Sequence, residues 1–274
     1  MTKTDDIELR LLLEAIYQRY HYDFRGYSVA SLKRRLNQAR QKFGFENLSK
    51  MQESILHDPE TFPRMLSYLT VQVSDMFRDP AYFRSIRDNV VPYLRTYPSL
   101  KVWVAGCSTG EELYSLAILF REEGLESRTL FYCTDINAEA LHKAEAGVYD
   151  IVRVAQFTEN HQRSGGKTSL SEYYTAAYGA AVFDKTLRKN AVFSDHSLVT
   201  DSVFAEVQLV SCRNVLIYFD RQLQDQAIGL FRDSLVRRGF LGLGSKESLR
   251  FSKYVSDFTE FDKQNRIYQR REVL

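Results

Sequence analysis

Residues 101–112 read Lys-Val-Trp-Val-Ala-Gly-Cys-Ser-Thr-Gly-Glu-Glu, and this stretch decides the fold class. A short apolar run is followed by a glycine-containing turn and then by the start of a helical pattern. Similar apolar runs lie at 130–133, 207–211 and 240–243, and the first two of these precede further helical patterns. Strands that alternate with helices form a mostly parallel sheet with helices on both faces. The sequence therefore predicts an α/β fold with a Rossmann-like core.

The first 95 residues show only helical patterns. Apolar residues recur at helical spacing in five segments, expected as helices at about 9–20, 28–43, 48–57, 60–70 and 80–94. We therefore divide the chain into a small N-terminal all-helical domain (1–78), a linker helix (79–95) and an α/β domain (96–274). The polar stretch at about 150–192 fits the strand–helix alternation poorly, and we interpret it as a small insertion subdomain.

The composition limits the classes of protein to which the chain can belong. It has 37 Lys and Arg against 35 Asp and Glu, whereas a protein that binds nucleic acid usually has a large positive surplus. The apolar runs are far shorter than a bilayer span, and the chain opens on acidic residues rather than on a leader. Three cysteines without CxxC spacing indicate reduced thiols and no zinc site. We expect a cytoplasmic protein with no bound metal, no nucleic-acid partner and no membrane insertion.

The loop after the first strand predicts a binding site for a positively charged nucleoside. In an open parallel sheet, ligands bind beyond the carboxyl ends of the strands, and Gly106 permits close approach of the backbone. Glu111 and Glu112 at the start of the next helix would repel a pyrophosphate, but they suit the charged S-adenosylmethionine. Alternatively, both glutamates only complement the helix dipole. Asp135 ends the second strand, where a carboxylate can accept both ribose hydroxyls; its alternative role is a helix cap.

Residues 211–220 read Ser-Cys-Arg-Asn-Val-Leu-Ile-Tyr-Phe-Asp and place polar side chains directly after a central strand. Further motifs are Ser-Asp-Met-Phe-Arg at 74–78, Ser-Thr-Gly-Glu-Glu at 108–112, Thr-Asp-Ile at 134–136 and Gly-Ser-Lys-Glu-Ser-Leu at 244–249. With these motifs in this order, the chain resembles the chemotaxis receptor methyltransferases of the CheR type over almost its whole length.

The resemblance implies an S-adenosylmethionine-dependent O-methyltransferase that forms γ-methyl esters on glutamates of methyl-accepting chemoreceptors, with S-adenosylhomocysteine as the product. It also implies that Arg78 and Tyr218 flank the transferring methyl group. The cofactor-binding residues that it implies are Gln72, Ser74, Arg78, Gly106, Glu112, Asp135, Ser197, Leu198, Arg213 and Asn214. Glu112 would meet the amino-acid part of the cofactor, Asp135 the ribose, and Ser197, Leu198, Arg213 and Asn214 the adenine side. Ser197 stands where family members usually carry Asn.

The chemistry requires no general base, because a glutamate side chain is already ionised at neutral pH. Arg78 can hold the carboxylate and Tyr218 can donate a hydrogen bond to it. No nucleophile–histidine arrangement is visible, and we interpret the five histidines, among them His161 and His196, as surface or core residues.

The helix expected at 28–43 carries a set of cations away from its apolar stripe. The family uses a basic helix against acidic receptor helices, so the resemblance assigns receptor docking to Lys33, Arg34, Arg35 and Arg40. The alternatives are a solvated helix face, an RNA methyltransferase surface, or a signalling adaptor that binds the cofactor without catalysis. Some members also bind a peptide at the receptor's C-terminus through a Gly-rich loop. The matching stretch at 173–193 lacks such a loop, so we expect a monomer that needs no C-terminal pentapeptide tether.

Overall fold

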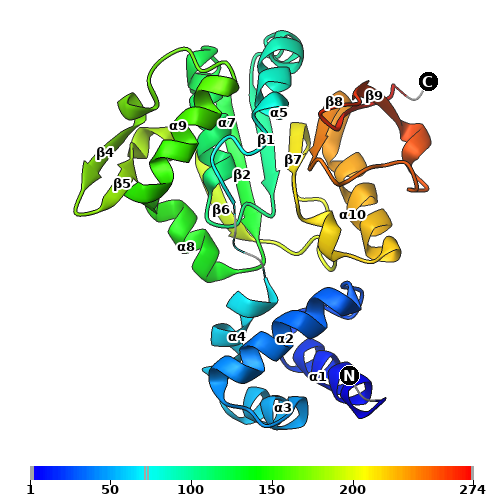
Figure 1. The fold of residues 1–274 in the computed structure, drawn as a ribbon. Helices are drawn as coiled ribbons and strands as arrows, with labels where there is room; N and C mark the ends of the chain where they lie inside the picture. Colours follow the sequence, from blue (N-terminus) through cyan, green and yellow to red (C-terminus); the bar gives the residue numbers. More distant parts are fainter. Residues whose placement is uncertain (1–2, 71, 73, 273–274) are drawn as a thin grey trace.

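The computed structural model describes residues 3–70, 72 and 74–272 and contains a helical lobe beneath an α/β body (Figure 1). The lobe consists of α1 (Lys3–Tyr20), α2 (Val29–Phe43), α3 (Leu48–His57) and α4 (Thr61–Leu69). Leu12, Leu36, Met51 and Met65 are buried between these helices. Gly44 ends α2 with φ +73°, a conformation that favours glycine, and its amide donates to the carbonyls of the last helical turn. The predicted N-terminal helices are confirmed.

One helical segment leads from the lobe into the body. It comprises α5 (Pro80–Ser85), a π-helical turn η1 (Ile86–Val90) and α6 (Val91–Leu94). Together these match the helix expected at 80–94. Tyr82 and Phe83 of α5 are fully buried against the sheet, which fixes the preceding segment 74–79 over the ends of the strands.

A seven-stranded sheet forms the centre of the body, in the order β6-β2-β1-β7-β8-β10-β9. All neighbouring strands from β6 to β8 are parallel, whereas β10 pairs antiparallel with both β8 and β9. The mostly parallel, Rossmann-like sheet is thus confirmed. The strands are β1 (Leu100–Ala105), β2 (Thr129–Asp135), β6 (Ala191–Asp195), β7 (Val207–Cys212), β8 (Leu235–Leu243), β9 (Phe258–Asp262) and β10 (Ile267–Arg270).

Helices cover both faces of this sheet. The main ones are α7 (Glu111–Glu122), α8 (Ala138–Ala146) and α10 (Arg221–Ser234). Side chains of β1 alternate between two apolar clusters, because Trp103 packs with Phe231 of α10 whereas Val102 packs with Phe120 of α7. The cluster around Trp103 also contains the core of the helical lobe, so lobe and sheet share one continuous apolar interior. None of the described helices is both long and apolar enough to cross a membrane.

The insertion is a separate three-stranded antiparallel sheet, in the order β3-β5-β4, with one helix. Its elements are β3 (Val148–Asp150), α9 (Val154–Arg163), β4 (Tyr174–Ala177) and β5 (Ala180–Phe183). The insertion was expected to run to about residue 192, but β6 from Ala191 onward belongs to the main sheet. Short 3₁₀ turns complete the chain: η2 (Glu126–Arg128), η3 (Ile151–Arg153), η4 (Leu170–Tyr173), η5 (Lys185–Arg188), η6 (Leu216–Tyr218) and η7 (Val255–Asp257).

A buried ionic cluster attaches the insertion to α7. Glu122 accepts hydrogen bonds from Arg87 at 2.6 Å and from the backbone amide of Lys167 at 3.1 Å, and it lies 3.0 Å from the ring of His161. Burial alone would raise the pKa of Glu122, but the hydrogen bonds from His161 and Arg87 outweigh it and lower that pKa to about 2. The segment 164–169 is therefore held to the body by charge as well as by packing.

Candidate active site

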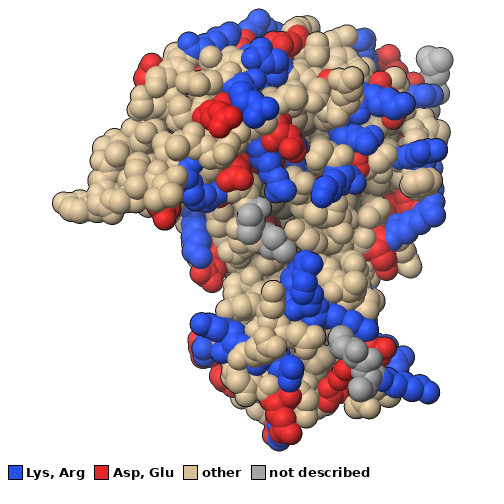
Figure 2. Space-filling model, in the orientation of Figure 1, with Lys and Arg blue, Asp and Glu red and all other residues tan. Residues whose placement is uncertain are grey.

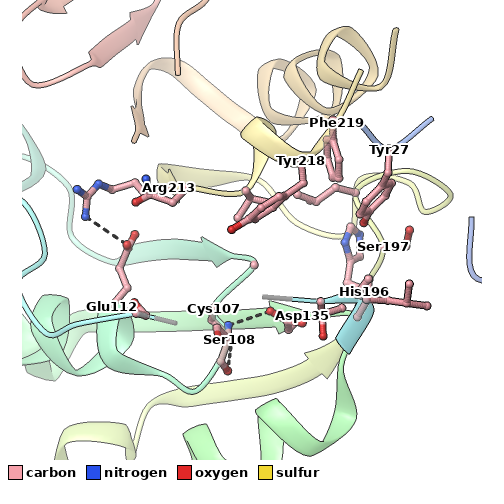
Figure 3. A pocket seen from close by; sticks show the side chains of 18 of the residues that line it. Tyr27, Cys107, Ser108, Glu112, Asp135, His196, Ser197, Arg213, Tyr218 and Phe219 are labelled. Carbon is pink, nitrogen blue, oxygen red and sulfur yellow. Dashed lines mark hydrogen bonds and ion pairs between the residues drawn. The ribbon is translucent and has the colours of Figure 1, made fainter. Parts of the chain in front are cut away.

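The predicted site residues meet in one pocket between the carboxyl ends of β1, β2 and β7 and the helical lobe (Figure 3). Nine of the ten predicted cofactor residues line it, and so does Tyr218. Gln72 is not among its lining residues; Val71 and Val73 beside it lie outside the described residues. The lining residues that were predicted are Ser74, Arg78, Gly106, Glu112, Asp135, Ser197, Leu198, Arg213, Asn214 and Tyr218.

The two glutamates that open α7 have different surroundings. Glu111 is fully buried on the far side of the loop, where it pairs with Arg153 at 2.9 Å and accepts a hydrogen bond from Thr109. Glu112 lines the pocket and is held by Ser211 and by Arg213, the latter at 3.4 Å. Of the two carboxylates, Glu112 is thus the one that can meet a positively charged ligand.

Asp135 organises the loop that follows β1. Its Oδ2 accepts the backbone amide of Ser108 at 2.8 Å (Figure 3). Its Oδ1 accepts the backbone amide of Asn137 at 2.9 Å. Burial raises the pKa of Asp135, and these amides oppose that rise. The amide of Ile136 also acts on this carboxylate, and the acceptor capacity that remains can receive a hydroxyl of a ligand. This geometry fits a ribose.

The guanidinium of Arg213 lies at the Glu112 end of the pocket, far from Ser197 at the other end (Figure 3). It pairs with Asp79 at 2.8 Å and stacks over the ring of Tyr82 at 4.1 Å, and only 1% of its side chain is exposed. The resemblance had placed Arg213 beside the adenine. The observed contacts instead assign its side chain to holding Glu112, because its charge is already directed toward two carboxylates.

Glu247 supports the polar segment after β7, a role that the sequence did not predict. Its Oε2 accepts the backbone amides of Gly244 at 2.6 Å and Asn214 at 3.0 Å, and its Oε1 accepts that of Ile217 at 3.3 Å. Asn214 has φ +62°, so this turn is conformationally demanding and benefits from the buried acceptor. Glu247 belongs to the motif at 244–249, which the sequence analysis identified. The sequence does not show, however, which backbone amides its carboxylate accepts.

The helical lobe forms the opposite wall of the pocket and joins the site through a short backbone seam. The amide of Ser28 donates to the carbonyl of Tyr218 at 2.8 Å, and the amide of Asp220 donates to that of Gly26 at 2.8 Å. Tyr27 lies between these bonds, pairs with Phe219 and points into the pocket (Figure 3). The seam therefore fixes the lobe directly to the segment that carries Tyr218.

Arg35 corrects the prediction for the basic helix. It was assigned to an exposed docking face, but it is 5% exposed and lines the pocket. Its guanidinium lies 4.5 Å from the ring centroid of Tyr218, and it donates to Ser31 at 2.7 Å and to the carbonyl of Leu69. Burial lowers the pKa of Arg35. Position 35 lies between Leu32 and Ala39 at helical spacing, so the helical periodicity could have placed it on the buried face.

The other predicted docking residues of α2 differ in how accessible they are to a partner protein. Arg34 is exposed, whereas Lys33 is half-buried and paired with Asp6 of α1. Arg40 is half-buried and donates to the carbonyl of Glu46 at 2.6 Å. The predicted docking surface therefore has fewer accessible cations than expected. Of the four predicted residues, Arg34 is the most exposed.

The pocket also contains a histidine that was interpreted as surface or core. His196 lines the pocket beside Ser197, with its ring 5.3 Å from that of Trp103. Its Nδ1 is buried without a hydrogen-bond partner among the described residues. Nothing in the sequence distinguished this histidine from His161, which lies in the ionic cluster of the insertion.

Comparison with known proteins connects this pocket to one family. Residues 7–70 match the model described as CheR methyltransferase, all-alpha domain, and residues 72–265 match CheR methyltransferase, SAM binding domain. A Pseudomonas putida protein named methyltransferase Cher3 is 56% identical over 268 residues, with 98% of both chains covered. The chemotaxis protein methyltransferase of Listeria innocua is 30% identical and covers 83% of this chain and 84% of its own. That of Vibrio parahaemolyticus is 27% identical and covers 83% and 82%.

Proposed function

Because the chain belongs to the CheR family of S-adenosylmethionine-dependent chemotaxis protein methyltransferases, we propose that it forms γ-methyl esters on glutamates of methyl-accepting chemoreceptors. The observation that carries this proposal is the division of charge within one pocket. Glu112 and Asp135 lie on the side of the sheet, and Arg35 and Arg78 line the same pocket. A cationic sulfonium cofactor suits the first pair, and a carboxylate acceptor suits the second.

S-adenosylmethionine supplies an electrophilic methyl group on a positively charged sulfur. The glutamate oxygen forms the new O–CH₃ bond while the bond between the methyl carbon and sulfur breaks. The electron pair of the broken C–S bond stays on the sulfur of S-adenosylhomocysteine. The residues of this chain bind and align the reactants, because the acceptor is already ionised and no proton has to be removed. Arg78 and Arg35 replace the water that the carboxylate loses on entering the pocket, and the Tyr218 hydroxyl donates to it.

The proposed partner is the cytoplasmic helical region of a chemoreceptor, in chemotaxis or in another chemosensory adaptation pathway. Its acidic helices would dock on the exposed cations of α2, chiefly Arg34 with Lys33 and Arg40 beside it. We propose that the enzyme acts in the cytoplasm and as a monomer. An RNA methyltransferase is less well supported, because the whole chain has a net charge of only +2.

We also propose that no C-terminal pentapeptide tether is needed. β4 and β5 are joined by the tight turn Tyr178-Gly179, with φ values of 49° and 77°, rather than by a Gly-rich loop. Such a turn supports the proposal because it leaves less room for an added peptide strand. Titration with peptides copied from receptor C-termini of the source organism tests it, and micromolar binding that competes in the methylation assay would contradict it.

The main test is methyl transfer from tritiated S-adenosylmethionine to membranes of the source organism. We expect base-labile, volatile label in receptor-sized bands, and no such label with the Arg78→Ala variant. Membranes whose receptor glutamates at the methylation sites are changed to alanine serve as the matched control. Label in RNA, or base-stable label in protein, would overturn the proposed reaction.

A further inference from the structure

A second hollow lies at the C-terminal side of the body and shares no lining residue with the catalytic pocket. Its walls are the segment 248–251, the segment that includes Val255 and the strands β9 and β10. Its volume is about 980 Å³, which is enough for several side chains of another protein. Figure 2 shows Lys and Arg gathered along the side of the body where Figure 1 places β8, β9 and α10. We name this hollow, defined by residues 248–251, 255, 258–260, 263, 266, 268 and 271, the C-terminal groove.

The charges of the C-terminal groove are unbalanced. Its lining contains four cations, Arg250, Lys263, Arg266 and Arg271, against the single carboxylate Glu260. Within the described part of the chain, none of these four side chains forms an ion pair. On α2, by contrast, Lys33 is paired with Asp6. Because the whole chain has a net charge of only +2, this concentration of uncompensated charge is local.

Exposed apolar side chains border the same groove. Phe251 is 66% exposed, and the guanidinium groups of Arg221 and Arg250 lie 5.3 and 5.5 Å from its ring centroid. Val255 is also exposed. Aromatic residues and arginines are enriched at the centres of protein interfaces, where they contribute much of the binding free energy. A concave surface with these residues fits the side chains of a partner better than a flat lipid surface.

We propose that the C-terminal groove binds an acidic, amphipathic segment of a protein partner. The apolar side chains of that segment pack against Phe251 and Val255, while its carboxylates meet Arg250, Arg266 and their neighbouring cations. This interaction does not depend on the methyl-transfer reaction, since the groove and the catalytic pocket have separate linings. It adds a binding surface on the body to the receptor-docking surface proposed on the helical lobe.

The experiment measures fluorescence anisotropy of the full chain with a labelled helical peptide that carries Leu on one face and Glu on the other. We expect micromolar binding that weakens as salt is added. A second peptide with the same number of Glu residues, but with each Leu replaced by Gln, should bind at least about tenfold more weakly because it lacks the apolar anchor. Cofactor binding, measured in parallel, reports that each variant is folded.

Three variants separate the groove from charge in general. Phe251→Ala should weaken binding of the Leu-Glu peptide about tenfold or more, and Arg250→Glu with Arg266→Glu should weaken it further. Lys143→Glu on α8 changes an exposed cation outside both proposed docking surfaces and should leave binding unchanged. Equal binding of both peptides, equal loss with Lys143→Glu, or absence of binding would each overturn the proposal. So would tighter, groove-dependent binding of anionic vesicles or of RNA.

Discussion

The two walls of the catalytic pocket are built in different ways. On the wall of strand ends, Glu112, Asp135 and Arg213 are each held by at least two polar contacts. The wall of the helical lobe presents Tyr27 and Arg35 and reaches the site through two backbone hydrogen bonds and the stacking of Arg35 on Tyr218. The strand-end wall is thus held by polar contacts within the α/β body, whereas the lobe wall is attached to that body by the seam and by the apolar interior that the two share. We therefore expect substitutions in the strand-end wall to act mainly on cofactor binding, and substitutions in the lobe wall to act mainly on alignment of the acceptor.

The largest expected effect concerns the support of the strand-end wall. Glu247→Ala removes the acceptor for three backbone amides, at Gly244, Asn214 and Ile217. Each buried amide left unpaired costs about 1–3 kcal/mol, so we expect the free energy of unfolding to fall by about 3–5 kcal/mol in urea denaturation. Lys246→Ala at the exposed neighbouring position is the control, with a change within about 0.5 kcal/mol. A similar small change for Glu247→Ala would mean that this turn is held by other contacts.

The second prediction concerns the cofactor. Asp135→Ala should weaken binding of S-adenosylmethionine and S-adenosylhomocysteine by about 1–3 kcal/mol in calorimetry, because the ribose acceptor and the anchor of the Ser108 amide are both lost. Glu139→Ala on the exposed face of α8 removes a nearby carboxylate outside the pocket and should change nothing. Tight binding of a dinucleotide, with none of S-adenosylhomocysteine, would be incompatible with the site described.

The third prediction separates the two walls. Arg35→Ala should lower kcat for receptor methylation by about 10- to 100-fold, the range expected for a lost hydrogen bond to a charged group. Cofactor affinity should stay within about threefold, because Arg35 belongs to the lobe wall. Arg34→Ala changes the exposed neighbour on the same helix and should leave kcat unchanged. Equal losses of cofactor affinity and kcat in the Arg35 variant would show that the two walls are not independent.

A smaller effect is expected at the seam itself. Tyr218→Phe keeps the ring on which Arg35 stacks and removes only the hydroxyl. We expect kcat to fall about tenfold through loss of one hydrogen bond from a neutral donor to the acceptor carboxylate, with cofactor affinity nearly unchanged. Tyr178→Phe at the exposed turn of the insertion provides a matched change away from the pocket. Full activity of Tyr218→Phe would remove that hydroxyl from the mechanism.

The smallest effect concerns docking outside the pocket. Arg34→Glu with Lys42→Glu reverses two exposed charges of α2 and should raise the KM for the receptor about threefold to fivefold at low salt. The salt dependence of KM should decrease, while kcat and cofactor affinity stay the same. Lys143→Glu on α8 reverses an exposed charge far along the chain and serves as the control. An unchanged KM would identify this face of α2 as a solvated surface only.

The order of strands and helices could be predicted from the sequence because each element carries its own periodic signal. The apolar runs of β1, β2, β7 and β8 are short but nearly continuous, because strands that are buried on both faces carry apolar residues on both sides. The strands β6, β9 and β10 were missed. They lie at or near the edges of the sheet, where partly exposed positions weaken that signal.

The residues of the candidate site also fall into two groups, those that local sequence patterns predict and those that only long-range packing brings to the pocket. Glu112, Asp135 and Arg213 stand directly after strands, and the topology of a parallel sheet alone brings such positions together. Sequence therefore determined the strand-end wall. Arg35 and Tyr27 reach the pocket only because the fold brings them into contact with residues distant in the chain, Leu69 for Arg35 and Phe219 for Tyr27. Helical periodicity indicates which face of α2 is buried. It does not indicate what that face contacts, because the contacts come from residues far away in the chain. In the folded protein, Arg35 on this face lines the catalytic pocket.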